Sequence, residues 1–200
     1  MTALPVLALL VLTQAQAPAE PSDAEGDSIL LAPKAGLFKS TTRLEVAPYY
    51  ALEVGYVTPL LNRRLAIVVE GSFSQPEVSG TLSDPRVTRG DVQYTLTERE
   101  IAILLSAMYR FEGALGSITP YAGAGPGLYL HQATTQALGA TTVEKKGTVG
   151  FQFLGGADLR LGPGGLFLEA HYHFAPGDFV TTGNANIGGF LAALGYRLRL

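Results

Sequence analysis

The fold is decided by TVGFQFLGGADLRL at positions 148–161, LFLEAHYHF at 166–174 and FLAALGYRLRL at 190–200. Each stretch largely alternates between residues for an apolar side and residues for a polar side. In the second stretch the apolar side carries Leu166, Leu168, Ala170, Tyr172 and Phe174. The other side carries Phe167, Glu169, His171 and His173. Such alternation, repeated along a chain in segments of about ten residues, is typical of a transmembrane β-barrel, whose apolar side faces lipid.

Length and composition limit the alternatives. The chain has 200 residues, which suggests one domain, and it is 47% hydrophobic and 16% charged, which argues against general disorder. A formal net charge of −3 provides no basic surface for nucleic acid. The chain has no cysteine, and this excludes disulfides, thiolate nucleophiles and thiolate metal sites.

The first residues have the pattern of a secretory signal. An apolar stretch at 3–12 is followed by Ala15-Gln16-Ala17, a small-residue cleavage sequence. We expect residues 1–17 to be a signal peptide, and residues 18–27, which are acidic and rich in proline, to be a disordered leader. The barrel domain is then expected at 28–200.

Eight segments of this domain have the character of strands. We predict them at 28–38, 49–58, 64–74, 93–111, 118–131, 148–161, 166–174 and 187–200. The intervening connections alternate in length, with short ones at 59–63, 112–117 and 162–165 and longer ones at 39–48, 75–92, 132–147 and 175–186. Outer-membrane barrels have short periplasmic turns and longer external loops. The expected fold is therefore all-β, an eight-stranded antiparallel up-and-down transmembrane β-barrel.

Aromatic residues occupy the ends of the apolar sides. Those near the short turns are Tyr56, Tyr109, Phe111 and Tyr196, and those near the long loops are Tyr50, Phe73, Phe174 and Phe190. Aromatic rings prefer the interface between membrane and water, so two such groups predict the two girdles of a membrane barrel.

Two further stretches carry a family resemblance: TPYAGAGPGLYL at 119–130 and LGYRLRL at 194–200. With the signal and the alternating strands, they resemble the small eight-stranded outer-membrane barrels of Gram-negative bacteria, which include the OmpA-like and OmpX-like barrel domains. The resemblance implies localisation in the cell outer membrane and contact with its lipid and lipopolysaccharide. It also implies insertion by the barrel-insertion machinery, which would read Gly195, Leu198 and Leu200.

The predicted interior is charged. We expect an interior network of Glu53, Glu70, Arg110, Asp158, Arg160, Glu169, His171, His173, Arg197 and Arg199. An eight-stranded barrel has room only for its own side chains, and an unpaired buried ion costs several kcal/mol or more. We therefore predict a closed network in which Arg160, Arg197 and Arg199 face Glu169 and Glu53. Lys34 can join it where the first and last strands pair. The role of this network is structural, and no open pore is expected.

One group of residues raises the possibility of chemistry. Glu169, His171 and His173 lie at alternate positions and would project to one side, where they could serve acid–base catalysis or bind a metal. Lipid A deacylases among outer-membrane barrels have a His-x-Ser arrangement facing the membrane, but no serine lies near these histidines. Two histidines two residues apart, without a clear third ligand, also fall short of a metal site. We expect no catalytic residue, metal or cofactor.

Three functions stay open at this point. The first is a non-enzymatic outer-membrane barrel with a structural, adhesive or surface-interaction role, acting through loops 75–92 and 132–147. The second is a lipid-modifying enzyme of the outer membrane. The third is a soluble lipocalin-like carrier, which would turn the apolar sides inward. We favour the first, in which the loop cations Arg86, Arg89, Lys145 and Lys146 could contact lipopolysaccharide phosphates. The sequence does not identify an extracellular partner.

Overall fold

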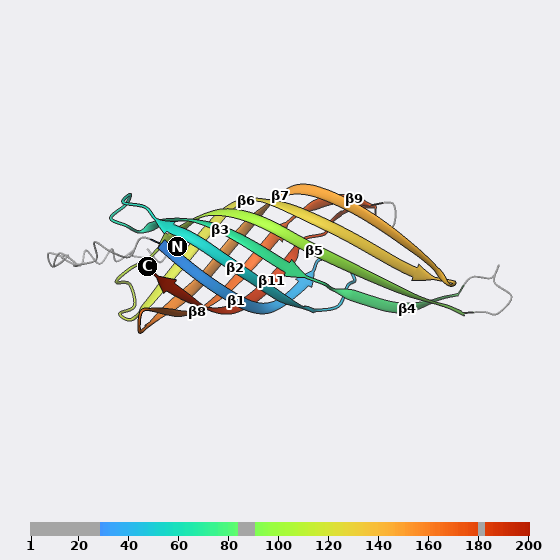
Figure 1. Cartoon of the computed structure of the whole chain (residues 1–200), viewed down its shortest axis with the longest axis horizontal. Coiled ribbons are helices and arrows are strands. Elements are labelled where there is room, and N and C mark those ends of the chain that lie inside the picture. Colours follow the sequence, from blue (N-terminus) through green and yellow to red (C-terminus); the bar gives the residue numbers. More distant parts are fainter. Residues whose placement is uncertain (1–28, 84–90, 180–182) are drawn as a thin grey trace, which may run out of the picture.

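The computed structural model describes residues 29–83, 91–179 and 183–200, and the expected signal peptide at 1–17 and leader at 18–27 lie outside these ranges. Eight strands form a closed antiparallel barrel (Figure 1): β1 (Ile29–Ser40), β2 (Ala47–Val57), β3 (Leu65–Ser74), β5 (Asp91–Arg110), β6 (Ile118–Ala137), β7 (Ala140–Leu161), β8 (Gly164–Phe174) and β11 (Gly189–Arg199). Three shorter strands are β4 (Glu77–Ser83), β9 (Pro176–Phe179) and β10 (Gly183–Asn186). The predicted fold class is confirmed.

The barrel closes where its first and last strands meet. β1 pairs antiparallel with β11, and Ile29 and Leu200 exchange backbone hydrogen bonds of 3.0 and 2.9 Å. Close contact between strands limits side-chain size at Gly125, where a Cβ atom would lie 1.9 Å from the Leu105 carbonyl oxygen. The glycines of 119–130 therefore allow neighbouring strands to approach closely in a curved wall.

The two faces of the wall have opposite chemistry. The outward face is apolar, with Leu52, Ile103 and Leu168 each more than half exposed on the isolated chain. The inward face buries charged groups such as Glu53, Glu169 and Arg197. A lipocalin-like carrier needs the reverse arrangement, so that alternative is wrong. No helix in the described part of the chain is long and apolar enough to cross a membrane.

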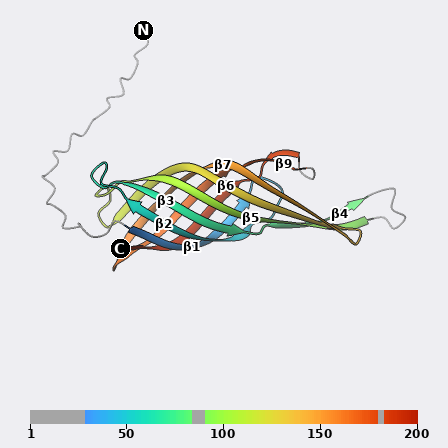
Figure 2. The ribbon, with the colours of Figure 1, turned by 45° about the horizontal axis from the view of Figure 1, so that its top comes forward.

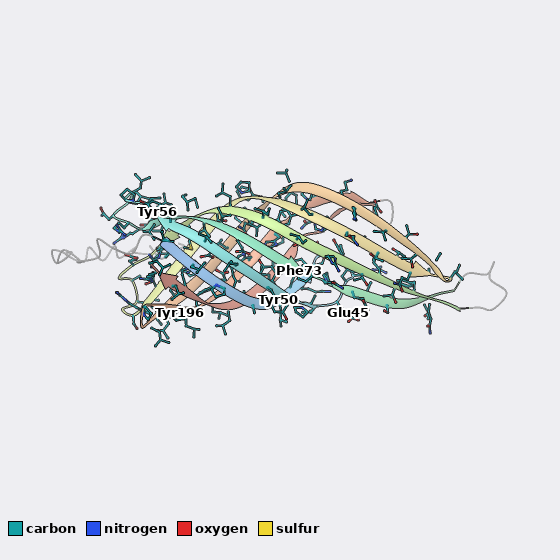
Figure 3. All side chains as sticks on the ribbon, viewed as in Figure 1. Glu45, Tyr50, Tyr56, Phe73 and Tyr196 are labelled. Carbon is teal, nitrogen blue, oxygen red and sulfur yellow. The ribbon has the colours of Figure 1, made fainter. Side chains whose placement is uncertain are left out.

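Aromatic residues lie on this outward face at two levels. Tyr56 and Tyr196 lie near the end that holds the short turns and the described termini, whereas Tyr50 and Phe73 lie further along the barrel axis (Figure 3). Tyr50 and Tyr56 are both more than half exposed on the isolated chain. Their placement matches the aromatic girdles that border the lipid-facing band of outer-membrane barrels.

Three strands continue far beyond the barrel wall (Figures 1 and 2). β5 and β6 have 20 residues each and β7 has 22, and together with β4 they form a four-stranded sheet that we call the extension. β4 continues the register of β3 on β5, because Ser74 pairs with Glu100 and Glu77 pairs with Thr97. Pro76, which has no backbone N–H, lies at the interruption between them.

The prediction of long loops at 132–147 and 75–92 is therefore wrong. Residues 132–147 form a paired hairpin, and 77–83 and 91–92 are strand, while 84–90 lie outside the described ranges. The hairpin was missed because it has no one-sided apolar pattern. Its β-branched residues nevertheless favour strands: Thr134, Thr135, Thr141, Thr142 and Val143. Similarly, β9 and β10 pair as a small hairpin in the predicted loop 175–186.

The tip of the β6–β7 hairpin generates a test. Ala137 pairs with Ala140 across a two-residue turn in which Leu138 has φ 53° and Gly139 has φ 75°. Asn adopts positive φ at about 1 kcal/mol lower cost than most side chains and is preferred in such turns. We predict that Leu138→Asn slows amide hydrogen exchange at the hairpin tip by roughly fivefold. Leu138→Ala keeps the strained φ and is the control; equal exchange in both variants would contradict the prediction.

Candidate functional site

The barrel interior holds a charge cluster that we call the central cluster: Lys34, Glu53, Glu70, Asp158, Glu169, His171 and Arg197. The fully buried ammonium of Lys34 lies 3.1 Å from Glu53 Oε2 and 2.6 Å from Glu70 Oε2, and it also contacts Glu169. Glu53 and Glu70 lie directly opposite each other on β2 and β3. Like charges in such a pair repel, so the shared ammonium is what makes the pairing favourable.

Arg197 is the second cation of the central cluster. Its Nη1 donates to both carboxylate oxygens of Asp158 at 2.9 Å, and its Nε donates to Glu53 Oε1 at 2.9 Å. The guanidinium also lies over the rings of Phe167 and Tyr121, 4.4 and 4.8 Å from their centroids. Charge-assisted bonds on two sides and aromatic faces nearby give a buried guanidinium most of the interactions that water would supply.

Neutral side chains complete the bonding of the carboxylates. Tyr49 donates its hydroxyl to Glu70, and Tyr121 donates its hydroxyl to Glu169 Oε2 at 2.9 Å. On the far side of the cluster, Gln152 links Ser106, at 2.7 Å, to His171 Nδ1, at 3.3 Å. Buried polar groups need such partners, so these uncharged residues belong to the network as much as the ions do.

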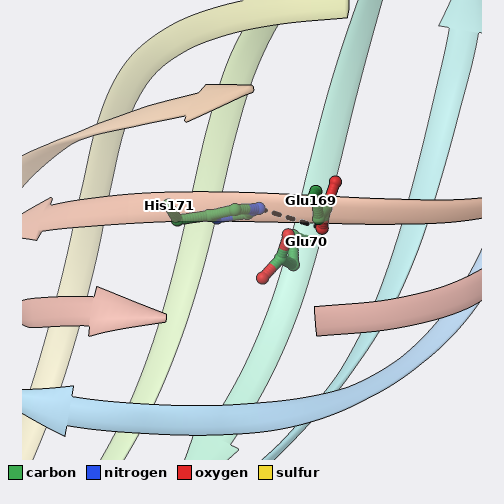
Figure 4. Close-up of side chains that lie close together, drawn as sticks. All are labelled: Glu70, Glu169 and His171. Carbon is green, nitrogen blue, oxygen red and sulfur yellow. Dashed lines mark ion pairs between the residues drawn. The ribbon is translucent and has the colours of Figure 1, made fainter. Parts of the chain in front are cut away.

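A metal site can be considered at Glu70, Glu169 and His171, whose possible ligand atoms all lie within 4.8 Å of one another. Figure 4 shows the three side chains, with Glu169 and His171 on β8 and Glu70 on β3. His171 Nε2 lies 2.9 Å from Glu169 Oε1. The ammonium of Lys34 contacts both carboxylates. A metal ion would have to displace that ammonium, so these residues fit a bound lysine better than a bound metal.

The histidines of the catalytic candidate have different partners. His173 lies 3.9 Å from Glu100, and its ring lies 5.5 Å from the ring of Tyr129, whereas His171 faces Glu169. All these groups are buried on the inner side of the wall. A lipid substrate would lie against the outer side, so the arrangement provides no access for lipid chemistry. A second acidic group lies beside them, where His131 Nδ1 is 2.9 Å from Glu98 and 3.6 Å from Glu100.

Three arginines of the expected network lie outside the central cluster, at the end of the barrel that holds the short turns. Arg160 is exposed, Arg199 is half-buried, and Arg110 is buried, with Nη1 3.0 Å from Glu112 Oε1. The prediction that Arg160 and Arg199 face Glu53 and Glu169 is therefore corrected. Alternation indicates the side of the strand correctly, but it does not give the depth along the barrel axis.

Comparison with known proteins reveals the fold alone. The chain is similar to Neisserial surface protein A (NspA), with a TM-score of 0.53 and 20% identity over 88% of this chain and 100% of that chain. It is also similar to a major outer membrane protein from Thermus thermophilus, with a TM-score of 0.57 and 9% identity over 86% of this chain and 99% of that chain. No protein-family model and no curated protein matches it. The chain has the fold of the small eight-stranded outer-membrane barrels, and its apolar outer wall places it in the outer membrane.

The central cluster predicts a large stability effect at one residue. Replacing Arg197 with Met leaves Asp158 and Glu53 without their main cation, and breaking a buried ion pair costs about 3–5 kcal/mol. We expect Arg197→Met to lower the free energy of unfolding in urea, measured in detergent micelles, by that amount. Arg99→Met, at an exposed arginine on β5, is the matched control and should change it by less than about 0.5 kcal/mol. If Arg197→Met and Arg99→Met lowered the free energy of unfolding equally, the central cluster would not be stabilising the barrel.

Proposed function

We propose that this outer-membrane barrel is non-enzymatic and acts at the cell surface, with the extension as its interacting part. The observation that carries the proposal is the division of the chain into two parts of different character. One part is a barrel filled by its own side chains. The other is a polar sheet, formed by β4 and the outer halves of β5, β6 and β7, that projects from the end opposite the described termini. In outer-membrane barrels that end is extracellular.

The filled interior argues against a channel. Lys34 on β1 joins Glu70 on β3 to Glu169 on β8. Arg197 on β11 joins Glu53 on β2 to Asp158 on β7. These ion pairs connect non-adjacent strands, so they cross the lumen, and an eight-stranded barrel has little other space.

The extension has the features of a binding surface. Polar pairs cover its outer face, as between Ser79 and Thr95 at 3.2 Å and between Thr97 and Glu77 at 2.9 Å. β4 is the terminal strand of the sheet order, and the pairing of β7 with β8 begins only at Phe151. Strand edges that lack a full partner present backbone N–H and C=O groups, and an extended peptide can pair with them.

The proposal includes contact with lipopolysaccharide at the outer limit of the lipid-facing band. Arg99, Gln132 and Lys145 pair in one row across β5, β6 and β7. The adjacent row toward the membrane contains Ile101 and Leu130, both exposed on the outer wall. Cations at this level suit the phosphate groups of lipid A. Arg86 and Arg89 lie outside the described residues. Insertion through Gly195, Leu198 and Leu200 is likewise part of the proposal.

Shortening the hairpin tests the surface role. Ala133 pairs with Glu144, so residues 134–143 can be replaced by Asn-Gly without a change of register. The shortened protein should remain heat-modifiable on detergent gels, because the barrel wall is intact. We predict that cells displaying the wild-type protein are retained on at least one of fibronectin, laminin or heparin surfaces, and that cells displaying the shortened protein are not.

The control for this experiment is Leu138→Asn, which keeps the full hairpin and should keep retention. Equal retention of the wild-type and shortened proteins, or no retention above cells that lack the protein, would contradict the surface role. A stable open pore in single-channel recordings would contradict the filled barrel.

A further inference from the structure

The end of the barrel that holds the short turns contains a cavity of about 320 Å³. Its walls come from the β2–β3 and β5–β6 turns, the final residues of β2, β5, β7 and β11, and the first residues of β6. Four arginines line it: Arg63, Arg110, Arg160 and Arg199. In the orientation proposed above, this mouth of the barrel opens to the periplasm.

The cavity has more cationic than acidic side chains in its lining. Among the described residues that line it, Glu112 is the one acid, and it pairs with Arg110 Nη1 at 3.0 Å. Asp158 lies deeper in the barrel, but both of its carboxylate oxygens accept hydrogen bonds from Arg197. The lining therefore collects four guanidinium groups and one carboxylate, an arrangement that favours an anion.

Arg110 supplies the second, independent observation. Its side chain is 4% exposed, and among the described residues its Nε and Nη2 atoms have no hydrogen-bond partner. The Nε atom of Arg199, which lines the same cavity, is also buried without a hydrogen-bond partner in the described ranges. A buried charged donor without an acceptor costs free energy, so an oxyanion between these groups would supply the missing acceptors.

The β2–β3 turn holds further donors at the cavity in an unusual conformation. Leu61, Asn62 and Arg63 have φ angles of 52°, 56° and 60°, a left-handed conformation that costs about 1 kcal/mol or more at Leu61 and Arg63 and less at Asn62. Asn62 and Arg63 both line the cavity, and Ser117 and Thr119 add hydroxyl donors from its other side. Strain of this kind is typical of backbone held in place for a site.

We propose that this cavity is an oxyanion-binding site, in which Arg110 and Arg199 hold a phosphate or carboxylate group from the periplasmic side. Two sources have this chemistry. One is a free phosphate-bearing or carboxylate-bearing solute. The other is the chain itself, because residues 18–27 contain Glu20, Asp23, Glu25 and Asp27 and precede β1, whose first residue lies at this end of the barrel.

Titration calorimetry with inorganic phosphate tests the site, on the barrel in a neutral detergent at low ionic strength, where charge interactions are least screened. Chloride at matched ionic strength gives the background. We expect saturable phosphate binding, and we expect Arg110→Gln to weaken it roughly tenfold or more, since it removes charge-assisted hydrogen bonds. Arg199→Gln should also weaken phosphate binding. If Arg110→Gln does not fold, Arg199→Gln still tests the site. Arg43→Gln, at an exposed arginine between β1 and β2 that lies outside the cavity lining, is the control.

A second protein, in which Glu20, Asp23, Glu25 and Asp27 are changed to Gln or Asn, separates the two sources. Phosphate binding by both proteins with equal affinity indicates a free solute. Binding that appears or strengthens only in the neutralised protein indicates that the acidic segment occupies the site. Both results support the oxyanion site. Absence of phosphate binding in both proteins, or unchanged binding in both Arg110→Gln and Arg199→Gln, would overturn it.

Discussion

The barrel depends on the sharing of two cations, Lys34 and Arg197, among the four buried carboxylates of Glu53, Glu70, Asp158 and Glu169. None of these groups could be buried alone, because an unpaired ion in a low-dielectric interior costs several kcal/mol. Apart from the Lys34–Glu53 pair, the partners come from non-adjacent strands, so most of the cost is offset only when β1 and β11 pair to close the wall. The same contacts that stabilise the fold also occupy the lumen.

This network and the lipid-facing wall also impose one strand register. A slip by one residue would turn every side chain of a strand to the opposite face. Lys34 would then face lipid, while its apolar neighbours on β1 would face Glu53 and Glu169. The extension lies outside this constraint because neither of its faces is uniformly apolar. The charge balance is different at the end of the barrel that holds the short turns, where arginines outnumber acidic residues in the cavity lining.

The sequence predicted well which side of the barrel wall each side chain faces, but it predicted poorly how deep each side chain lies along the barrel axis. Alternation in 148–174 places Phe151 and Phe153 outside and Asp158 and Glu169 inside, as the structure has them. Arg160 and Arg197 share the same inward alternation, yet one lies at the mouth and the other is fully buried, because depth depends on strand tilt and register. The extension was missed because a sheet exposed on both faces has no apolar side to detect. Tyr49 and Tyr121 were not assigned to the network. Their sequence neighbours are glycines and apolar residues, and the carboxylates that accept their hydrogen bonds lie on other strands.

A double-mutant cycle on Arg197 and Asp158 tests the central claim most directly. The free energy of unfolding would be measured for the wild-type protein, Arg197→Met, Asp158→Leu and the double variant, all in detergent micelles. If the buried pair carries the stability of the barrel, the double variant is less destabilised than the sum of the single variants, with a coupling energy of about 1 kcal/mol or more. Effects that add to within about 0.3–0.5 kcal/mol would show that the two groups act independently and would contradict the account.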